Sequence, residues 1–181
     1  MELWDIYDKN KKPTGRTMKR NDWHLKDGEY HLTVLGVVAR EDGTFLITKR
    51  VMTKAWAPGW WEVSGGAAQA GEESYEAVLR EVKEETGLEL TSYQFRGIVT
   101  FISDEWPDEY MCLYTADRYT GDIGNCDEGE LVWVEKGKIM DLNIWEGDKI
   151  FLKLLTENQP FFSLKLEYKG DKLVNTVLNK Y

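Results

Sequence analysis

The feature that most constrains the fold is a segment in which a glycine-containing loop leads directly into one amphipathic helix, residues 66–88. Apolar side chains recur at helical spacing between residues 74 and 86, namely Tyr75, Val78, Leu79 and Val82. This spacing predicts a helix with one face on a hydrophobic core. We expect Ser74 to cap its N-terminus and Gly87 to end it.

The rest of the chain predicts mostly strands. A polar turn within residues 8–21 separates two short strands, and residues 32–50 predict a hairpin that turns at 41–43. Residues 55–66 predict a loop with a short strand at 61–63. Further strands are expected near 93–101, 110–119 and 131–134, followed by a helix near 147–158 and a terminal hairpin. We therefore expect an N-terminal extension (1–30), a central domain (31–160) and a C-terminal hairpin (161–181).

Composition excludes several classes of protein. The 181 residues include 32 acidic and 23 basic ones, and the net charge of -9 argues against a protein that binds the nucleic-acid backbone. No apolar run approaches the roughly 20 residues of a membrane span, and the start of the chain lacks a basic and apolar signal region. We expect a cytoplasmic protein whose two cysteines are free thiols. The chain has 23 aromatic residues, eight of them Trp, and we expect most of these aromatic residues to be core while some could stack on a flat ligand.

Three carboxylates share one face of the predicted helix, next to its apolar side: Glu81, Glu84 and Glu85. Like charges at these spacings destabilise a helix by about 0.2 to 0.5 kcal/mol per pair. A hard cation would relieve the repulsion, because magnesium prefers oxygen ligands and commonly shares them with substrate phosphates. Taken alone, the pattern fits either a metal site or a solvated acidic face.

The segment in front of the helix favours the metal site. Gly65 and Gly66 allow the backbone to approach a metal closely. The string from Gly66 through Glu72, Arg80 and Glu81 to Gly87-Leu88 matches every defined position of the Nudix box, G-x5-E-x7-R-E-U-x-E-E-x-G-U, where U is bulky and aliphatic. The chain therefore resembles the Nudix hydrolases. This resemblance implies an α/β fold (α+β), an α/β/α sandwich with a mixed sheet.

The resemblance also implies roles for these residues. Glu81, Glu84, Glu85 and the Gly65 carbonyl would hold magnesium or manganese, and Glu72 and Arg80 would hold the ligands in place. Metal ions bridge a diphosphate and activate a water that attacks phosphorus. Glu84 or Glu81 is favoured as the base, but acidic residues on predicted loops are alternatives, namely Glu105, Asp108, Glu109, Asp127, Glu128 and Glu130.

A longer stretch is similar to the isopentenyl diphosphate isomerase branch of the same fold. Its histidine pair matches His24 and His31, and its diphosphate-binding Arg and Lys match Arg50 and Lys54. However, Gly65 and Ala67 stand where the isomerase has its catalytic Cys and a metal-binding His. We expect Arg50 and Lys54 to bind substrate, whereas His24 and His31 are equally compatible with structural and metal-binding roles.

The sequence thus predicts an enzyme, a magnesium-dependent Nudix pyrophosphohydrolase. We expect it to cleave a diphosphate linkage in a small molecule, a nucleoside diphosphate joined to another moiety. The alternatives are an isomerase-like enzyme and a non-catalytic module that senses nucleotides. A homodimer is compatible with the sequence, which contains no pattern that decides oligomeric state.

Overall fold

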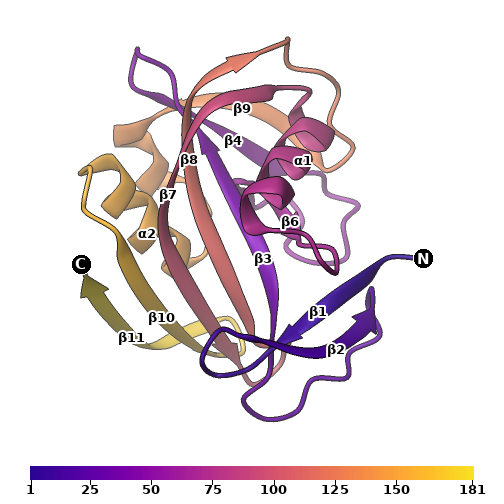
Figure 1. Ribbon diagram of the computed structural model, residues 1–181. Helices are drawn as coiled ribbons and strands as arrows, with labels where there is room; N and C mark the ends of the chain where they lie inside the picture. Colours follow the sequence, from indigo (N-terminus) through magenta and orange to yellow (C-terminus); the bar gives the residue numbers. More distant parts are fainter.

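One large mixed sheet of eight strands forms the centre of the computed structural model, which describes residues 1–181 (Figure 1). Its strands run in the order β11-β10-β7-β8-β3-β1-β2, with β6 also paired to β3, and β5, β4 and β9 form a second sheet of three strands. The pairs β3–β8 and β10–β7 are parallel. The strands are β1 (Leu3–Tyr7), β2 (Pro13–Lys19), β3 (Tyr30–Val38), β4 (Thr44–Arg50), β5 (Trp61–Glu62), β6 (Ser64–Ala67), β7 (Glu89–Ser103), β8 (Glu109–Thr120), β9 (Gly129–Glu135), β10 (Phe162–Lys169) and β11 (Lys172–Lys180).

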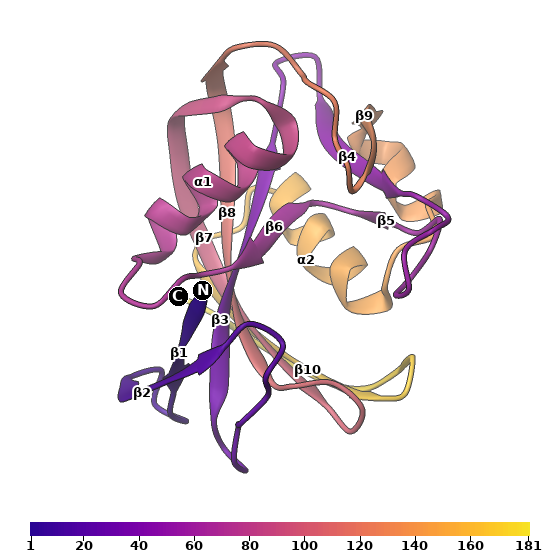
Figure 2. The same ribbon diagram turned by 90° about the vertical axis from the view of Figure 1, so that its right-hand side faces the viewer.

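Helices cover both faces of the large sheet. α1 (Ser74–Thr86) lies on one side and α2 (Glu146–Thr156) on the other, with β3, β7 and β8 between them (Figures 1 and 2). A short 3-10 helix (Lys136–Asp141) follows β9. This arrangement confirms the predicted α/β/α sandwich with a mixed sheet.

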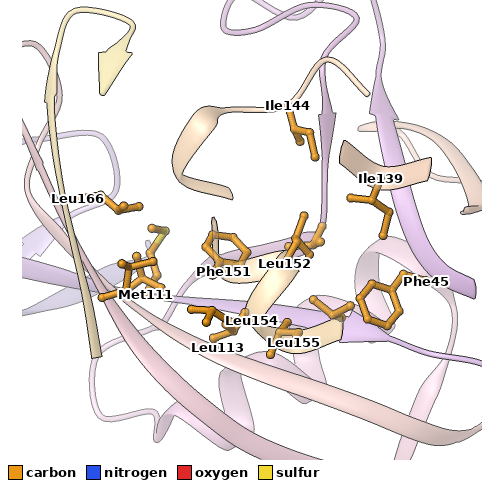
Figure 3. Close-up of a cluster of buried hydrophobic side chains, with 14 of the residues drawn as sticks. Phe45, Met111, Leu113, Ile139, Ile144, Phe151, Leu152, Leu154, Leu155 and Leu166 are labelled. Carbon is orange, nitrogen blue, oxygen red and sulfur yellow. The ribbon is translucent and has the colours of Figure 1, made fainter. Parts of the chain in front are cut away.

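Each helix has a hydrophobic core of its own. The larger core, of 18 buried residues, joins α2 to the sheet through side chains such as Phe151, Leu152 and Leu166 (Figure 3). The second, of 10 buried residues, joins Val78 and Val82 of α1 to the opposite face. Side chains alternate along a strand, so β3 can contribute to both cores at once.

The bounds of α1 agree with the predicted helix, but its cap does not. Glu73 is the N-cap residue, and its N–H donates to the Glu76 carboxylate at 3.0 Å, so the prediction of Ser74 was wrong. The Ser74 hydroxyl instead bonds the Tyr114 hydroxyl at 2.7 Å. Gly87 ends the helix in the left-handed conformation, as predicted. Tyr75, expected on the apolar face, is exposed.

The predicted hairpin at 32–50 was wrong in its pairing. The chain does turn between β3 and β4, but an isolated bridge from Ala39 to Phe45 is all that joins them. One edge of β3 is paired with β8, and the other is shared by β1 and β6. Because these strands take most of both edges of β3, β4 pairs with β5 and β9 in the smaller sheet.

The remaining predictions had mixed outcomes. The two N-terminal strands, the three central strands, α2 and the terminal hairpin β10–β11 are present, and both cysteines are free. The region expected to be loop up to residue 66 includes β6. Seven of the 23 aromatic residues are buried, so the expectation that most of them are core was wrong. No helix is both long and apolar enough to cross a membrane. The three domain boundaries stay a prediction.

Candidate active site

α1 packs against β3 and β6 (Figure 2), and a glycine in each of these strands lies close to side chains of the helix. At Gly36 of β3, a Cβ atom would lie 2.6 Å from a methyl group of Val82 and 2.9 Å from one of Val78. At Gly66 of β6, a Cβ atom would collide with the Glu81 carboxylate. The two contacts at Gly36 are far shorter than normal contact distances, so α1 packs closely on β3 because Gly36 has no side chain, whereas the Glu81 carboxylate lies directly over Gly66.

Arg80 organises the acidic side chains around it. Its Nε and one terminal nitrogen each donate to the Glu72 carboxylate at 2.8 Å, in the forked geometry typical of Arg. Its other terminal nitrogen donates to Glu81 at 2.6 Å, and the guanidinium also reaches the Ala67 carbonyl at 3.2 Å. The hydrogen bonds and charges of Glu72 and Glu81 raise the pKa of Arg80. Partial burial would raise the pKa of Glu72, but the hydrogen bonds from Arg80 and from the Gln69 N–H lower it overall. Arg80 thus restrains both Glu72 and Glu81, and the role of Glu72 and Arg80 in holding metal ligands stays a prediction.

The three helix carboxylates differ in environment. Burial, with the nearby charges of Glu81 and Glu62, raises the pKa of Glu85 to about 8 although it accepts the Gly65 N–H at 3.3 Å. Burial also raises the pKa of Glu81 against the opposing effect of Arg80. The Glu84 side chain is 61% exposed and lies 3.5 Å from Arg80. The face thus contains two partly desolvated carboxylates and one open to water.

This donor set is suited to a hard divalent cation. Glu81 and Glu85 are partly buried carboxyl groups with raised pKa values, and a divalent cation such as magnesium or manganese would stabilise their ionised forms. No three His, Cys, Asp or Glu side chains converge closely enough to enclose a metal by themselves. Magnesium usually completes its shell with water and substrate phosphate, so a site of this kind needs few protein ligands.

The structure brings Arg50 close to this region but pairs it with protein groups. Its guanidinium donates to Glu62 at 2.7 Å and to the Trp56 carbonyl at 3.1 Å, and its side chain is only 12% exposed. Lys54 forms an ion pair with Glu128 at 2.6 Å. Both predicted phosphate-binding groups are therefore engaged by carboxylates in the free protein.

The two histidines occupy different environments. His24 is 66% exposed and lies 3.1 Å from Asp22. His31 is buried, with its Nε2 3.2 Å from Glu109 and its ring stacked on Trp4 at a centroid distance of 5.5 Å. The Nδ1 atom of His31 has no hydrogen-bond partner. The structure thus does not join His24 and His31 in a common cluster with the α1 carboxylates.

A cavity of about 520 Å³ adjoins the β6 glycines. Its wall includes Gly65 and Gly66, and it extends to Glu62 of β5, Glu109 of β8 and Asp148 of α2. Burial, with the charges of Glu62 and Glu109, raises the pKa of Asp148 to about 7. The sequence analysis missed Glu62 and Asp148, because neither belongs to a motif and only the folded chain brings them together.

Known proteins share both the sequence pattern and the fold. The family model of the NUDIX domain matches residues 29–155. A Nudix hydrolase of Listeria monocytogenes is 36% identical over 124 residues, which are 68% of this chain and 72% of that protein. The nucleoside triphosphatase NudI of Salmonella typhimurium is 29% identical over 134 residues, 67% of this chain and 95% of that protein.

A solved structure agrees with these relatives. The crystal structure of a mutator MutT protein from Bacillus halodurans superposes with a TM-score of 0.74 at 25% identity, over 82% of this chain and 97% of that one. The chain belongs to the Nudix family and is an enzyme that hydrolyses phosphorus-containing anhydrides.

Proposed function

We propose that the enzyme cleaves a diphosphate linkage in a nucleoside diphosphate joined to another moiety, with magnesium or manganese bound. The observation that carries this proposal is the desolvated pair Glu81 and Glu85, held against β6 beside a cavity large enough for a nucleoside-sized group. A divalent cation at Glu81, Glu84, Glu85 and the Gly65 carbonyl would neutralise both protein and phosphate oxygens. The similarity to a nucleoside triphosphatase supports a nucleotide substrate, since a nucleoside triphosphate is itself a nucleoside diphosphate joined to phosphate.

The chemistry is the attack of water on one phosphorus of the diphosphate. A new P–O bond forms, the bridging P–O bond breaks, and the bridging oxygen leaves with the second phosphoryl group. A bound metal lowers the pKa of the attacking water and neutralises the developing charge. Glu84, the most exposed of the three carboxylates, is available to accept the water proton, while Arg80 fixes the orientation of Glu81.

Arg50 and Lys54 would bind the phosphates by exchanging partners. Each is held by a carboxylate in the free protein, Glu62 and Glu128 respectively. A phosphate oxygen offers a stronger acceptor for the forked guanidinium than a single carboxylate contact does. We propose that substrate competes with these ion pairs, which keep both cations close to the site.

The two alternatives make different predictions. An isomerase would convert isopentenyl diphosphate without releasing phosphate, yet Gly65 and Ala67 occupy the positions of its Cys and His. A nucleotide sensor would bind without turnover, although the full set of helix carboxylates is retained here. A cytoplasmic location and a homodimer likewise stay predictions.

The test is a substrate screen with matched variants. Nucleotide sugars, dinucleotides, nucleoside triphosphates and isopentenyl diphosphate are assayed with and without magnesium for phosphate or monophosphate release. We expect metal-dependent turnover that falls about 100-fold or more in Glu85→Gln and Glu84→Gln, because each loses a charge needed in the transition state. Glu41→Gln, an exposed turn residue, is the control and should retain full activity. Turnover without metal, or either site variant within tenfold of the unmodified enzyme, would contradict the assigned roles.

A further inference from the structure

The cavity beside β6 has an unusual wall, both aromatic and acidic. Its wall includes all three exposed Trp residues of the chain, Trp23, Trp56 and Trp106, together with Trp145, Phe101 and Tyr168. Exposing a Trp ring to water costs hydrophobic free energy, so three such rings around one cavity indicate that a ligand covers them. Trp106 is 48% exposed and stacks on no other aromatic ring, which leaves its face open.

The charged residues of the wall are all of one sign, apart from His31. Glu62, Glu109 and Asp148 line the cavity, and no Lys or Arg does. Glu62 is paired with Arg50, which lies outside the wall, and Glu109 is paired with His31. The Asp148 carboxylate forms no hydrogen bond or ion pair with the protein, although the residue is partly buried in the first turn of α2. One carboxylate in the cavity therefore lacks a counter-charge.

We propose that this cavity binds a planar, positively charged ring of the substrate, such as an N-alkylated heteroaromatic ring. The Asp148 carboxylate supplies the counter-charge, and Trp106 supplies an open ring face for stacking. A cation over an indole ring is stabilised by the ring quadrupole, most strongly when the site is partly desolvated. Arg50 already illustrates the preference, because its guanidinium lies 4.9 Å from the centre of the Trp56 ring.

Other occupants fit the wall less well. A metal ion would need about six oxygen ligands, whereas most of this wall is aromatic or aliphatic carbon. An anionic group would meet three carboxylates. A neutral ring could stack on Trp106 but would leave Asp148 partly desolvated and without a counter-charge, which costs free energy. The cavity chemistry thus selects for charge as well as for shape.

This inference rests on the proposed function, in which the substrate is a diphosphate. The cavity reaches the β6 glycines, which lie beside Glu81 and Glu85. Its test requires neither metal nor turnover. The probes are 1-methylnicotinamide, a planar cation, and nicotinamide, which lacks the methyl group and the charge. Binding to the full chain is followed through the indole N–H signals in proton–nitrogen NMR spectra, at about pH 8.5, where the Asp148 carboxylate is ionised.

We expect 1-methylnicotinamide to bind about tenfold more tightly than nicotinamide, which is a reasonable value for one charge contact in a half-buried site. Asp148→Asn should remove this preference, and Asp117→Asn, an exposed control on β8 with the same charge change, should retain it. Trp106→Leu should weaken the binding of both probes. Equal binding of the two probes, no binding of either, or a preference that survives Asp148→Asn would overturn the proposal. Hydrolysis with magnesium would be unaffected by such a result, so the two proposals fail separately.

Discussion

At the scale of single residues, Arg80 is the side chain on which the site geometry depends most. It contacts Glu72, Glu81, Glu84 and the Ala67 carbonyl, and so links α1 to the loop before it. Arg80→Lys keeps the charge but cannot form the fork to Glu72 while also contacting Glu81. We expect kcat to fall about 10 to 100-fold, the range typical of groups that orient metal ligands.

The same substitution should also destabilise the fold, by about 1 to 3 kcal/mol, because charged hydrogen bonds are lost in a partly buried position. Urea unfolding gives this value, and steady-state kinetics under saturating magnesium give kcat. Lys83→Arg, on the exposed side of the same helix, is the control. If Arg80→Lys kept normal turnover, Arg80 would not position the catalytic carboxylates.

The residues that the sequence revealed are those whose roles are encoded by local spacing. Glu81, Glu84 and Glu85 share a helix face because of the helical repeat alone, and the structure places Glu81 and Glu85 against β6. The contributions of Glu62 and Asp148 could not be found in this way, because they are far apart in sequence from the box and from each other. Likewise, the high aromatic count suggested that some rings could stack on a flat ligand, but it did not indicate which rings.

At the scale of secondary structure, the contact between α1 and β3 depends on the absence of a side chain at Gly36. A methyl group there would overlap Val82 and Val78, both fully buried. Overpacking of this kind typically costs 1 to 3 kcal/mol, so we expect Gly36→Ala to lower the free energy of unfolding by about that amount.

Urea unfolding of Gly36→Ala checks this prediction against Gly137→Ala. Gly137 lies in the 3-10 helix, and an added Cβ atom there would meet no neighbour. The midpoint of unfolding should therefore fall in the first variant and stay within error in the second. Equal midpoints would show that α1 can shift away from β3 without cost.

The pairing of β4 illustrates which element-level properties the sequence does not contain. The two apolar runs and the turn at 41–43 are correctly located, and a short turn between strands usually makes a hairpin. Here both edges of β3 are taken by strands from distant parts of the chain, β8 on one side and β1 and β6 on the other. Local periodicity predicts that a strand exists, but its neighbours depend on which long-range pairs fill its edges.

At the scale of the whole molecule, the site carboxylates make stability depend on pH. The pKa values of Glu62, Glu81, Glu85 and Asp148 are all raised by burial, to about 8 for Glu85 and about 7 for Asp148. A carboxyl group with a raised pKa holds its proton more tightly in the folded state. Such a carboxyl group contributes fully to the stability of the fold below its pKa in the unfolded chain, about 4. This contribution is lost as pH rises through its pKa in the folded protein. These four groups thus oppose folding increasingly between about pH 4 and pH 8.

A divalent cation at the site should reverse this loss, because it stabilises the ionised carboxylates of the folded protein. At 100 times its dissociation constant, a ligand that binds only the folded state adds about 2.7 kcal/mol to the free energy of unfolding. Protons compete with the metal for Glu85 below its pKa of about 8, so magnesium should raise Tm more at about pH 8.5 than at about pH 6.

Thermal unfolding at both pH values, with sodium chloride at matched ionic strength as control, measures the difference. In Glu85→Gln the magnesium-dependent rise should shrink and lose most of its pH dependence, because the competing proton site has gone. An equal rise at the two pH values in the unmodified enzyme, or an undiminished rise in Glu85→Gln, would place the metal away from this carboxylate.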